Sequence, residues 1–237
     1  MTSFRGFNLV ATKCCGSVYS TPRYSSINAS AFEYWTDGAR VHSLMPTDGG
    51  LRRCKCGTYF LISTTFKVGF EEERSTPSPE FVKDSDLSLL LAEELTKEVE
   101  IVVRRRYWRY LNEPYRDIYR AHRDLEDLKK QRMNSFFSVA LKRLGIVKNQ
   151  NAYEEKFTVP DFLPTSEFRH NLERLLELVQ QEQSNDYLEI SEIFRELSRF
   201  DEAAATLNKL TDKTSKTAAL LQQLVGEKAN APYRYKM

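Results

Sequence analysis

The chain has 237 residues, of which 41% are hydrophobic and 12% aromatic, and its net charge is +2. These proportions exclude wholesale disorder. The longest apolar runs, such as residues 89–92, are far shorter than the roughly 20 residues that a membrane-spanning helix needs, so no membrane partner is expected.

The cysteine content and the first residues bear on the compartment. Four cysteines are too few for a disulfide scaffold in a chain of this length, and their paired clustering suits a reducing compartment. The first residues lack the apolar stretch and the small-residue cleavage site of a secretory signal. We therefore expect a cytoplasmic protein.

Residues 1–70 carry the signals of strands and turns. β-branched and aromatic residues recur at short intervals, and Asp37-Gly38 and Asp48-Gly49-Gly50 are typical turn sequences. The pattern predicts a small antiparallel β-rich head.

Two cysteine pairs lie in this predicted head, Cys14-Cys15 and Cys54-Lys55-Cys56, and each is followed by a glycine. Cys54 and Cys56 could bind one metal ion from the same face of a strand, with Cys15 and either Cys14 or His42 completing the site. Adjacent cysteines in an extended backbone would instead point to opposite faces. Two readings stay open, a zinc site at Cys14, Cys15, Cys54 and Cys56, or reduced structural cysteines in a head that has lost its metal.

The rest of the chain is predicted to be mostly helical. An acidic run with two prolines indicates a linker at 71–83. A helix is expected from Asp84 or Ser85 to about Leu111, with a stop at Asn112-Glu113-Pro114, and a second helix completes a long helical hairpin over 84–150. A helical bundle is expected over 151–237, with helices at about 166–182, 185–198, 201–211 and 214–226.

The predicted helix pair at 185–211 resembles a tetratricopeptide repeat. The small residue of the helix crossing falls on Ala203, and the large residues of the repeat fall on Tyr187, Ile190, Phe194 and Phe200. An ordinary helical hairpin remains the alternative.

The cysteine pairs, the turn-rich segment between them and the Arg106 to Arg116 region together resemble a group of uncharacterised bacterial proteins. In that group a zinc-ribbon-like head precedes a helical, repeat-like tail. The resemblance implies an α+β fold, with a small antiparallel, zinc-ribbon-like head followed by a mostly α-helical, tetratricopeptide-like body. It implies no activity.

A basic aromatic segment is the main candidate for a binding surface. The residues that could contact nucleic acid are Arg104, Arg105, Arg106, Trp108 and Arg109. Interleaved rings could stack on bases while the arginines contact phosphates. In the other interpretation the aromatic residues are core, and the arginines lie on the solvated helix face, where they pair with nearby acidic side chains.

The sequence contains no phosphate-binding loop, dinucleotide fingerprint, nucleophile elbow or metalloprotease motif. We therefore expect a non-enzymatic module, an adaptor that binds a protein partner. The alternative is a nucleic-acid-binding protein that uses the 104–109 segment and the cysteine head, in which Arg52, Arg53 and Lys55 are also basic.

Overall fold

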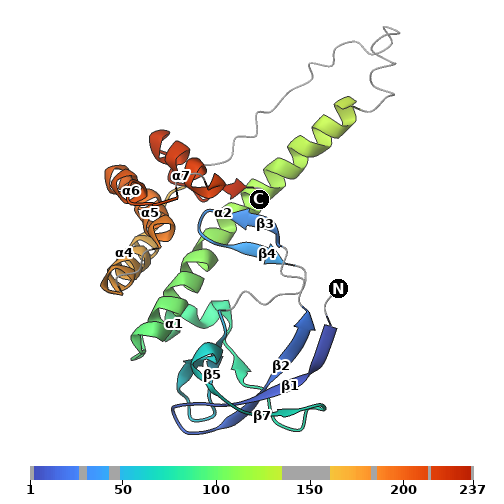
Figure 1. Cartoon of the computed structure of the whole chain (residues 1–237). Helices are drawn as coiled ribbons and strands as arrows, with labels where there is room; N and C mark the ends of the chain where they lie inside the picture. Colours follow the sequence, from blue (N-terminus) through green and yellow to red (C-terminus); the bar gives the residue numbers. More distant parts are fainter. Residues whose placement is uncertain are drawn as a thin grey trace. The chain divides into compact units, whose positions relative to one another are not determined.

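The computed structural model describes residues 3–26, 31–42, 49–134, 161–182, 186–212 and 215–235 (Figure 1). Small antiparallel sheets form from the N-terminal part and helices follow, so the predicted α+β class is confirmed. The end of the predicted hairpin and the start of the predicted bundle, at 135–160, lie outside the described residues. The chain forms two compact units, Met1–Leu111 with Pro164–Met237, and Asn112–Leu163.

The first sheet is antiparallel and has the strand order β2-β1-β7. Its strands are β1 (Ser3–Ala11), β2 (Val18–Ser26) and β7 (Phe66–Glu71). Gly6 breaks the regular register of β1 at a positive φ of 77°, and a Cβ atom there would lie 2.6 Å from the carbonyl oxygen of Glu71. Only glycine allows this close approach between the strands.

Two further antiparallel sheets have the orders β6-β5-β8 and β4-β3-β9. Their strands are β5 (Leu51–Arg53), β6 (Tyr59–Leu61), β8 (Glu80–Phe81), β3 (Ala31–Trp35), β4 (Arg40–His42) and β9 (Arg234–Tyr235). The predicted turn at Asp37-Gly38 joins β3 to β4, and Asp37 Oδ1 accepts from Ala39 N at 2.9 Å. Strand β9 lies near the C-terminal end of the sequence and pairs with β3 of the N-terminal head.

Residues 71–83, predicted as a linker, are hydrogen-bonded to the head. Ser20 N donates to the carbonyl of Pro77 at 2.9 Å, and Ser20 Oγ donates to the carbonyl of Thr76 at 2.8 Å. Strand β8, at the end of the segment, pairs with β5. A proline at a sheet edge can still offer its carbonyl group, which explains how this proline-rich segment packs here.

The helical part begins with a 3₁₀ turn (Asp84–Asp86) and the short helix α1 (Leu87–Leu90). The chain then leaves helical geometry before the long helix α2 (Lys97–Asn134). The prediction of one continuous helix from Asp84 or Ser85 to about Leu111 is therefore wrong. Among the described residues no helix is long and apolar enough to cross a membrane.

The predicted helix stop at Asn112-Glu113-Pro114 is also wrong, because Pro114 lies inside α2. A proline in a helix interior removes one backbone hydrogen bond, a loss that neighbouring interactions must offset. Here Glu113 accepts from Arg116 and from Arg120, the latter at 2.7 Å, and Arg120 also donates to Asp117 at 2.7 Å. These ion pairs link the turns that follow the proline.

The last four helices lie where the periodicity predicts them. They are α4 (Ser166–Gln181), α5 (Tyr187–Glu196), α6 (Phe200–Leu207) and α7 (Lys216–Gly226). Thr165, Asp186 and Ser215 cap α4, α5 and α7 by accepting from backbone N–H groups in the first turn. Helix α5 contacts α4, α6 and α7, so it is the central helix of this group.

An apolar core joins the β6-β5-β8 sheet to α1 and to the first turns of α2. Its buried members are Leu51, Leu61, Val82, Leu87, Leu90, Val99, Val103 and Tyr107. A smaller cluster, Val10, Tyr19, Cys54 and Phe60, packs beside the cysteine turns. The cysteine part of the head therefore has little apolar core of its own.

Candidate metal centre

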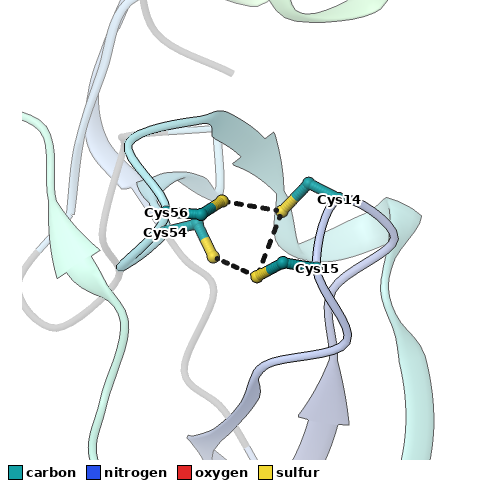
Figure 2. A group of neighbouring side chains, drawn as sticks. All are labelled: Cys14, Cys15, Cys54 and Cys56. Atoms are coloured by element: carbon teal, nitrogen blue, oxygen red, sulfur yellow. Dashed lines mark hydrogen bonds between the residues drawn. The ribbon is translucent and has the colours of Figure 1, made fainter.

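The turn between β1 and β2 carries Cys14 and Cys15. Thr12 N donates to the carbonyl of Ser17 at 2.9 Å, and Gly16 N donates to the carbonyl of Thr12 at 3.0 Å, so the chain reverses at the two cysteines. Gly16 has a positive φ of 69°, a conformation that glycine adopts without strain. Because Cys14 and Cys15 lie in a turn and not in extended backbone, their thiols are free to converge on one side (Figure 2).

The turn between β5 and β6 carries the second cysteine pair. Cys54 N donates to the carbonyl of Thr58 at 2.8 Å, and Gly57 N donates to the carbonyl of Cys54 at 2.9 Å. Gly57 has a positive φ of 90°. Each turn is thus a tight reversal with a glycine directly after the last cysteine, and the expectation that Cys54 and Cys56 lie on one face of a strand is wrong.

The two turns bring the four thiols together, as Figure 2 shows. All four Sγ atoms lie within 4.8 Å of one another. The shortest Sγ–Sγ distances are 3.4 Å for Cys15 to Cys54 and 3.5 Å for Cys56 to Cys14, and Cys14 to Cys15 is 3.9 Å. Four sulfurs at about 2.3 Å from a tetrahedral ion would be about 3.8 Å apart. The group could therefore bind a metal ion.

The sequence left open whether Cys14 or His42 completes the candidate metal site, and the residues of the thiol group distinguish between the two. Cys14 belongs to it, whereas His42 does not, within the part of the chain that the structure describes. None of the thiols forms a disulfide bond. Cys54 is the buried member, and the other three are exposed, so an ion could enter from solvent.

Hydroxyl groups surround the thiols and hold their orientation. The Tyr19 hydroxyl donates to Cys54 Sγ at 3.4 Å and itself accepts from Lys55 N at 2.7 Å. Ser17 Oγ lies 2.8 Å from Cys15 Sγ. The Tyr19 ring stacks on Phe60, with ring centroids 5.9 Å apart, and this contact fixes the position of the tyrosine. Tyr19 is thus a supporting residue that the cysteine spacing did not predict.

The thiols differ in pKa. Burial by itself would raise the pKa of Cys54, but hydrogen bonds from the backbone of Cys56, from Tyr19 and from neighbouring thiols lower this pKa to about 5. Desolvation raises the pKa of Cys14 to about 12. The hydrogen bonds from Ser17 lower the pKa of Cys15. Cys54 therefore ionises more readily than Cys14, and the thiolate is the form of cysteine that binds metals.

The basic aromatic segment lies in the first half of α2, and its arginines are paired within the chain. Arg104 Nε is 2.8 Å from Glu100, and Arg105 Nε is 2.6 Å from Glu189. Arg106 pairs with Asp84 and also donates to the carbonyl of Val82 at 3.0 Å. Arg104 and Arg106 are buried. These three positive charges are therefore already neutralised at close range.

The aromatic side chains of the same segment also point inward. Trp108 is buried, and its Nε1 donates to Glu196 Oε2 at 2.7 Å. Tyr107 is buried too and donates to Glu167. Arg109 Nε donates to the carbonyl of Asp37 at 3.4 Å. The segment thus connects α2 to α4, α5 and the β3–β4 turn, and its residues are not part of the cysteine cluster.

A group of buried charges in α5 was missed by the sequence reasoning. Glu192, Arg195 and Glu196 are each fully buried, and Arg195 donates to Glu192 at 2.6 and 2.7 Å. Arg195 also donates to the carbonyl of Ala229 and, at 3.4 Å, to Thr36 Oγ1. The spacing of Glu192 and Arg195, three residues apart on a helix, was the available signal.

Comparisons with protein-family models, with curated proteins and with solved structures find no match for this chain. The chemistry of the four cysteines therefore has to follow from their geometry.

Proposed function

We propose that this chain is a non-enzymatic binding module whose head is stabilised by one zinc ion bound to Cys14, Cys15, Cys54 and Cys56. The observation that carries the proposal is the convergence of four thiols, within 4.8 Å of one another, from two glycine-closed turns far apart in the sequence. Such an arrangement is the sulfur-only ligand set of structural zinc sites, and it supports a zinc-ribbon-like head.

The choice of zinc rests on the ligands. A tetrahedral set of four sulfurs is typical of zinc or of iron. Four protein ligands close the coordination sphere, whereas a catalytic zinc ion keeps one position for water or substrate. A closed site of this kind supports a structural role. The unbridged thiols suit a reducing compartment, which supports the cytoplasm as the location.

The protein-binding role rests on the helical body. Helices α5 and α6 form a tight hairpin with Ala203 fully buried, and Ser191 Oγ donates to the carbonyl of Ala203 at 3.1 Å. Close packing at a small residue is how a tetratricopeptide-like pair joins its two helices. Helical hairpins of this kind commonly present their outer surface to a peptide or a partner helix. A protein partner is therefore proposed for this part.

The metal half of the proposal is tested by elemental analysis of the purified protein, with about one zinc per chain expected. Cobalt substitution should give the visible absorption of a tetrahedral thiolate site. Cys56→Ser should lose the metal, and the matched control His42→Ala should keep it. A folded wild-type chain without metal, or metal loss in His42→Ala as large as in Cys56→Ser, would contradict the proposed ligand set.

The partner half is tested by affinity capture from lysate with and without nuclease. A protein that the wild-type chain retains after nuclease treatment, and that a variant with a disrupted α5–α6 hairpin does not retain, supports a protein-binding role. Capture that disappears with nuclease contradicts it.

A further inference from the structure

The first sheet has two faces, and the strand register tells which residues share each face. Residues directly opposite one another in an antiparallel ladder point to the same side. Val10 lies opposite Tyr19, and both pack on Cys54 and Phe60, so this is the inner face. The residues on the other side, here called the outer face, are mostly apolar: Phe4, Phe7, Leu9, Ala11, Val18, Pro22, Tyr24 and Phe66.

Large apolar side chains of the outer face are exposed. The exposed fraction is 59% for Phe66, 51% for Phe4 and 43% for Tyr24. Phe4 forms edge contacts with Phe7 and Tyr24, with ring centroids 5.0 and 6.1 Å apart, so three rings gather at one end of the face. Phe66 lies opposite Ala11, toward the cysteine turn. An exposed apolar patch of this kind marks a site of interaction.

Cationic side chains accompany these rings. Lys13 Nζ lies 5.4 Å from the centroid of the Phe66 ring, and the Arg74 guanidinium lies 4.8 Å from the centroid of the Phe7 ring. Residues 3–26 contain no Asp or Glu, and of their cations Lys13 lies at a ring of this face, whereas Arg23 lies on the inner side, over the Phe70 ring. Cations beside exposed rings attract an anionic ligand to the surface that carries the rings.

An acidic run follows the sheet at Glu71, Glu72 and Glu73. Glu71 lies opposite Phe7, but its carboxylate accepts from Ser75 Oγ at 2.7 Å and from Thr76 Oγ1 at 3.1 Å. The acidic run is therefore at one end of β7, and Glu71 is turned toward the loop that follows. Arg74 directly follows this run and lies over Phe7 at the same end of the face, whereas Lys13 lies over Phe66 at the other end.

We propose that the outer face of the β2-β1-β7 sheet binds a single-stranded polynucleotide, with bases stacked on Phe4, Tyr24 and Phe66 and phosphates held by Lys13 and Arg74. Exposed aromatic residues on a sheet, with cations beside them, are the general means of binding unpaired bases. A double helix hides its base faces and cannot stack on such a surface. A second copy of the chain would bring like charges together at Lys13 and Arg74. The surface is separate from the 104–109 segment, whose charges are paired within the chain.

The test measures binding of the full-length chain to a labelled single strand by fluorescence anisotropy. The probe is a thymidine oligonucleotide about 12 nucleotides long, within the range of single-strand site sizes. Phe66→Ala and Phe4→Ala should each weaken binding about 5- to 150-fold, the loss of one stacked base. Phe32→Ala is the matched control, because Phe32 is 66% exposed but lies on β3 in another sheet, and its affinity should be unchanged. Lys13→Gln should reduce the salt dependence by about 0.7 in the log–log slope.

The variants are at exposed positions, and equal thermal stability with the wild type will show that their folds are intact. The proposal would be overturned if folded Phe4→Ala and Phe66→Ala variants bound the probe with the same affinity as Phe32→Ala. A wild-type chain that does not bind the probe at low salt, or that binds a duplex of equal length more tightly, would overturn it as well. A dimer in sedimentation that Phe66→Ala converts to a monomer would also overturn it, since the face would then bind a second copy.

Discussion

The cysteine-bearing head and the helices around α5 are stabilised in different ways. Beside the cysteines the buried apolar cluster consists of Val10, Tyr19, Phe60 and Cys54 itself, and three of the four thiols are exposed. In α5, every residue from Ile190 to Glu196 is buried, including three charged ones. The head has too little apolar surface to hold its turns together, whereas α5 has enough contacts on all sides to bury an ion pair.

This difference shows what each region depends on. A small β unit with a minimal core usually needs a metal ion or another cross-link. A central helix depends on close packing and on complete pairing of its buried charges. Removing the metal should therefore affect the head alone, and changes in α5 or α6 should affect the helical group.

The largest expected effect is that of metal removal. Structural zinc contributes about 10–16 kcal/mol in isolated zinc fingers, which is comparable to the whole stability of a typical domain. Chelation should therefore abolish amide exchange protection in β1, β2 and the two cysteine turns, while α5 and α6 keep theirs. Hydrogen exchange with mass spectrometry of the metal-loaded and chelated chain would measure this. If α5 lost its amide exchange protection to the same degree, the head and the helices around α5 would not be stabilised independently.

The next largest effect concerns Arg195. Arg195→Met removes the cation between Glu192 and Glu196 and leaves two carboxylates buried, which typically costs about 3–5 kcal/mol. Arg199→Met is the matched control, because the Arg199 and Glu202 side chains are about half exposed, and such pairs contribute at most about 1 kcal/mol. Urea unfolding of the two variants gives both values. Equal losses would mean that the buried group does not contribute to stability.

A smaller loss is expected from overpacking the crossing of α5 and α6. Ala203 is fully buried, and its carbonyl accepts from Ser191 on α5, so a larger side chain has no space there. Ala203→Leu should cost about 1–3 kcal/mol. Glu202→Ala, at the exposed neighbouring position, should change stability by less than about 1 kcal/mol. Thermal melting compares the two, and an Ala203→Leu variant as stable as the wild type would refute the close helix crossing.

The smallest expected effect is a gain in stability, from Glu196→Gln, and it depends on pH. Burial raises the pKa of Glu196 well above 4.5, and the Glu192 and Asp37 carboxylates raise it further. A raised pKa gives stability that is present below 4.5 and is lost as the pH rises through the folded-state value. Glu196→Gln keeps an acceptor for Trp108 and removes the buried titratable carboxyl group, so it should stabilise the protein at neutral pH, by on the order of 1 kcal/mol.

This gain should disappear below about pH 4, where the carboxyl group is protonated in both states. Glu192→Gln is the contrasting control, because Glu192 accepts two hydrogen bonds from Arg195, and it should destabilise the chain. Melting temperatures of the three proteins at pH 4 and pH 7 test the sign. A Glu196→Gln variant less stable than the wild type at pH 7 would show that Glu196 is ionised and paired in the folded protein.

Local pattern in the sequence was sufficient to predict several elements. The periodicity and the capping residues of α4, α5 and α7 are properties of consecutive residues, so their ranges were predicted closely. The cysteine turns were not predicted, because Cys54 and Cys56 were expected on one face of a strand, although the glycines that follow the cysteines, Gly16 and Gly57, were an available signal. Composition was enough to name Cys15, Cys54 and Cys56 as candidate ligands, but it left Cys14 and His42 as alternatives for the fourth.

The sequence did not determine how distant segments meet. Pro114 is tolerated inside α2, and no pattern around Asn112-Glu113-Pro114 distinguishes this from a helix end. The 104–109 segment has the composition of an anion-binding surface, yet its arginines pair with Glu100, Asp84 and Glu189, of which Asp84 and Glu189 lie outside α2. Such long-range pairs depend on which side chains packing brings close, and a one-dimensional pattern does not encode this.

The sequence by itself determined the two classes of element and the approximate ranges of the C-terminal helices, because each depends on backbone preferences of neighbouring residues. Only the tertiary structure decided that β9 pairs with β3, that Cys14 joins the thiol group while His42 does not, and that the outer face of the first sheet is exposed. These features depend on distances between residues far apart in the chain. Burial and hydrogen bonding over the whole fold set those distances.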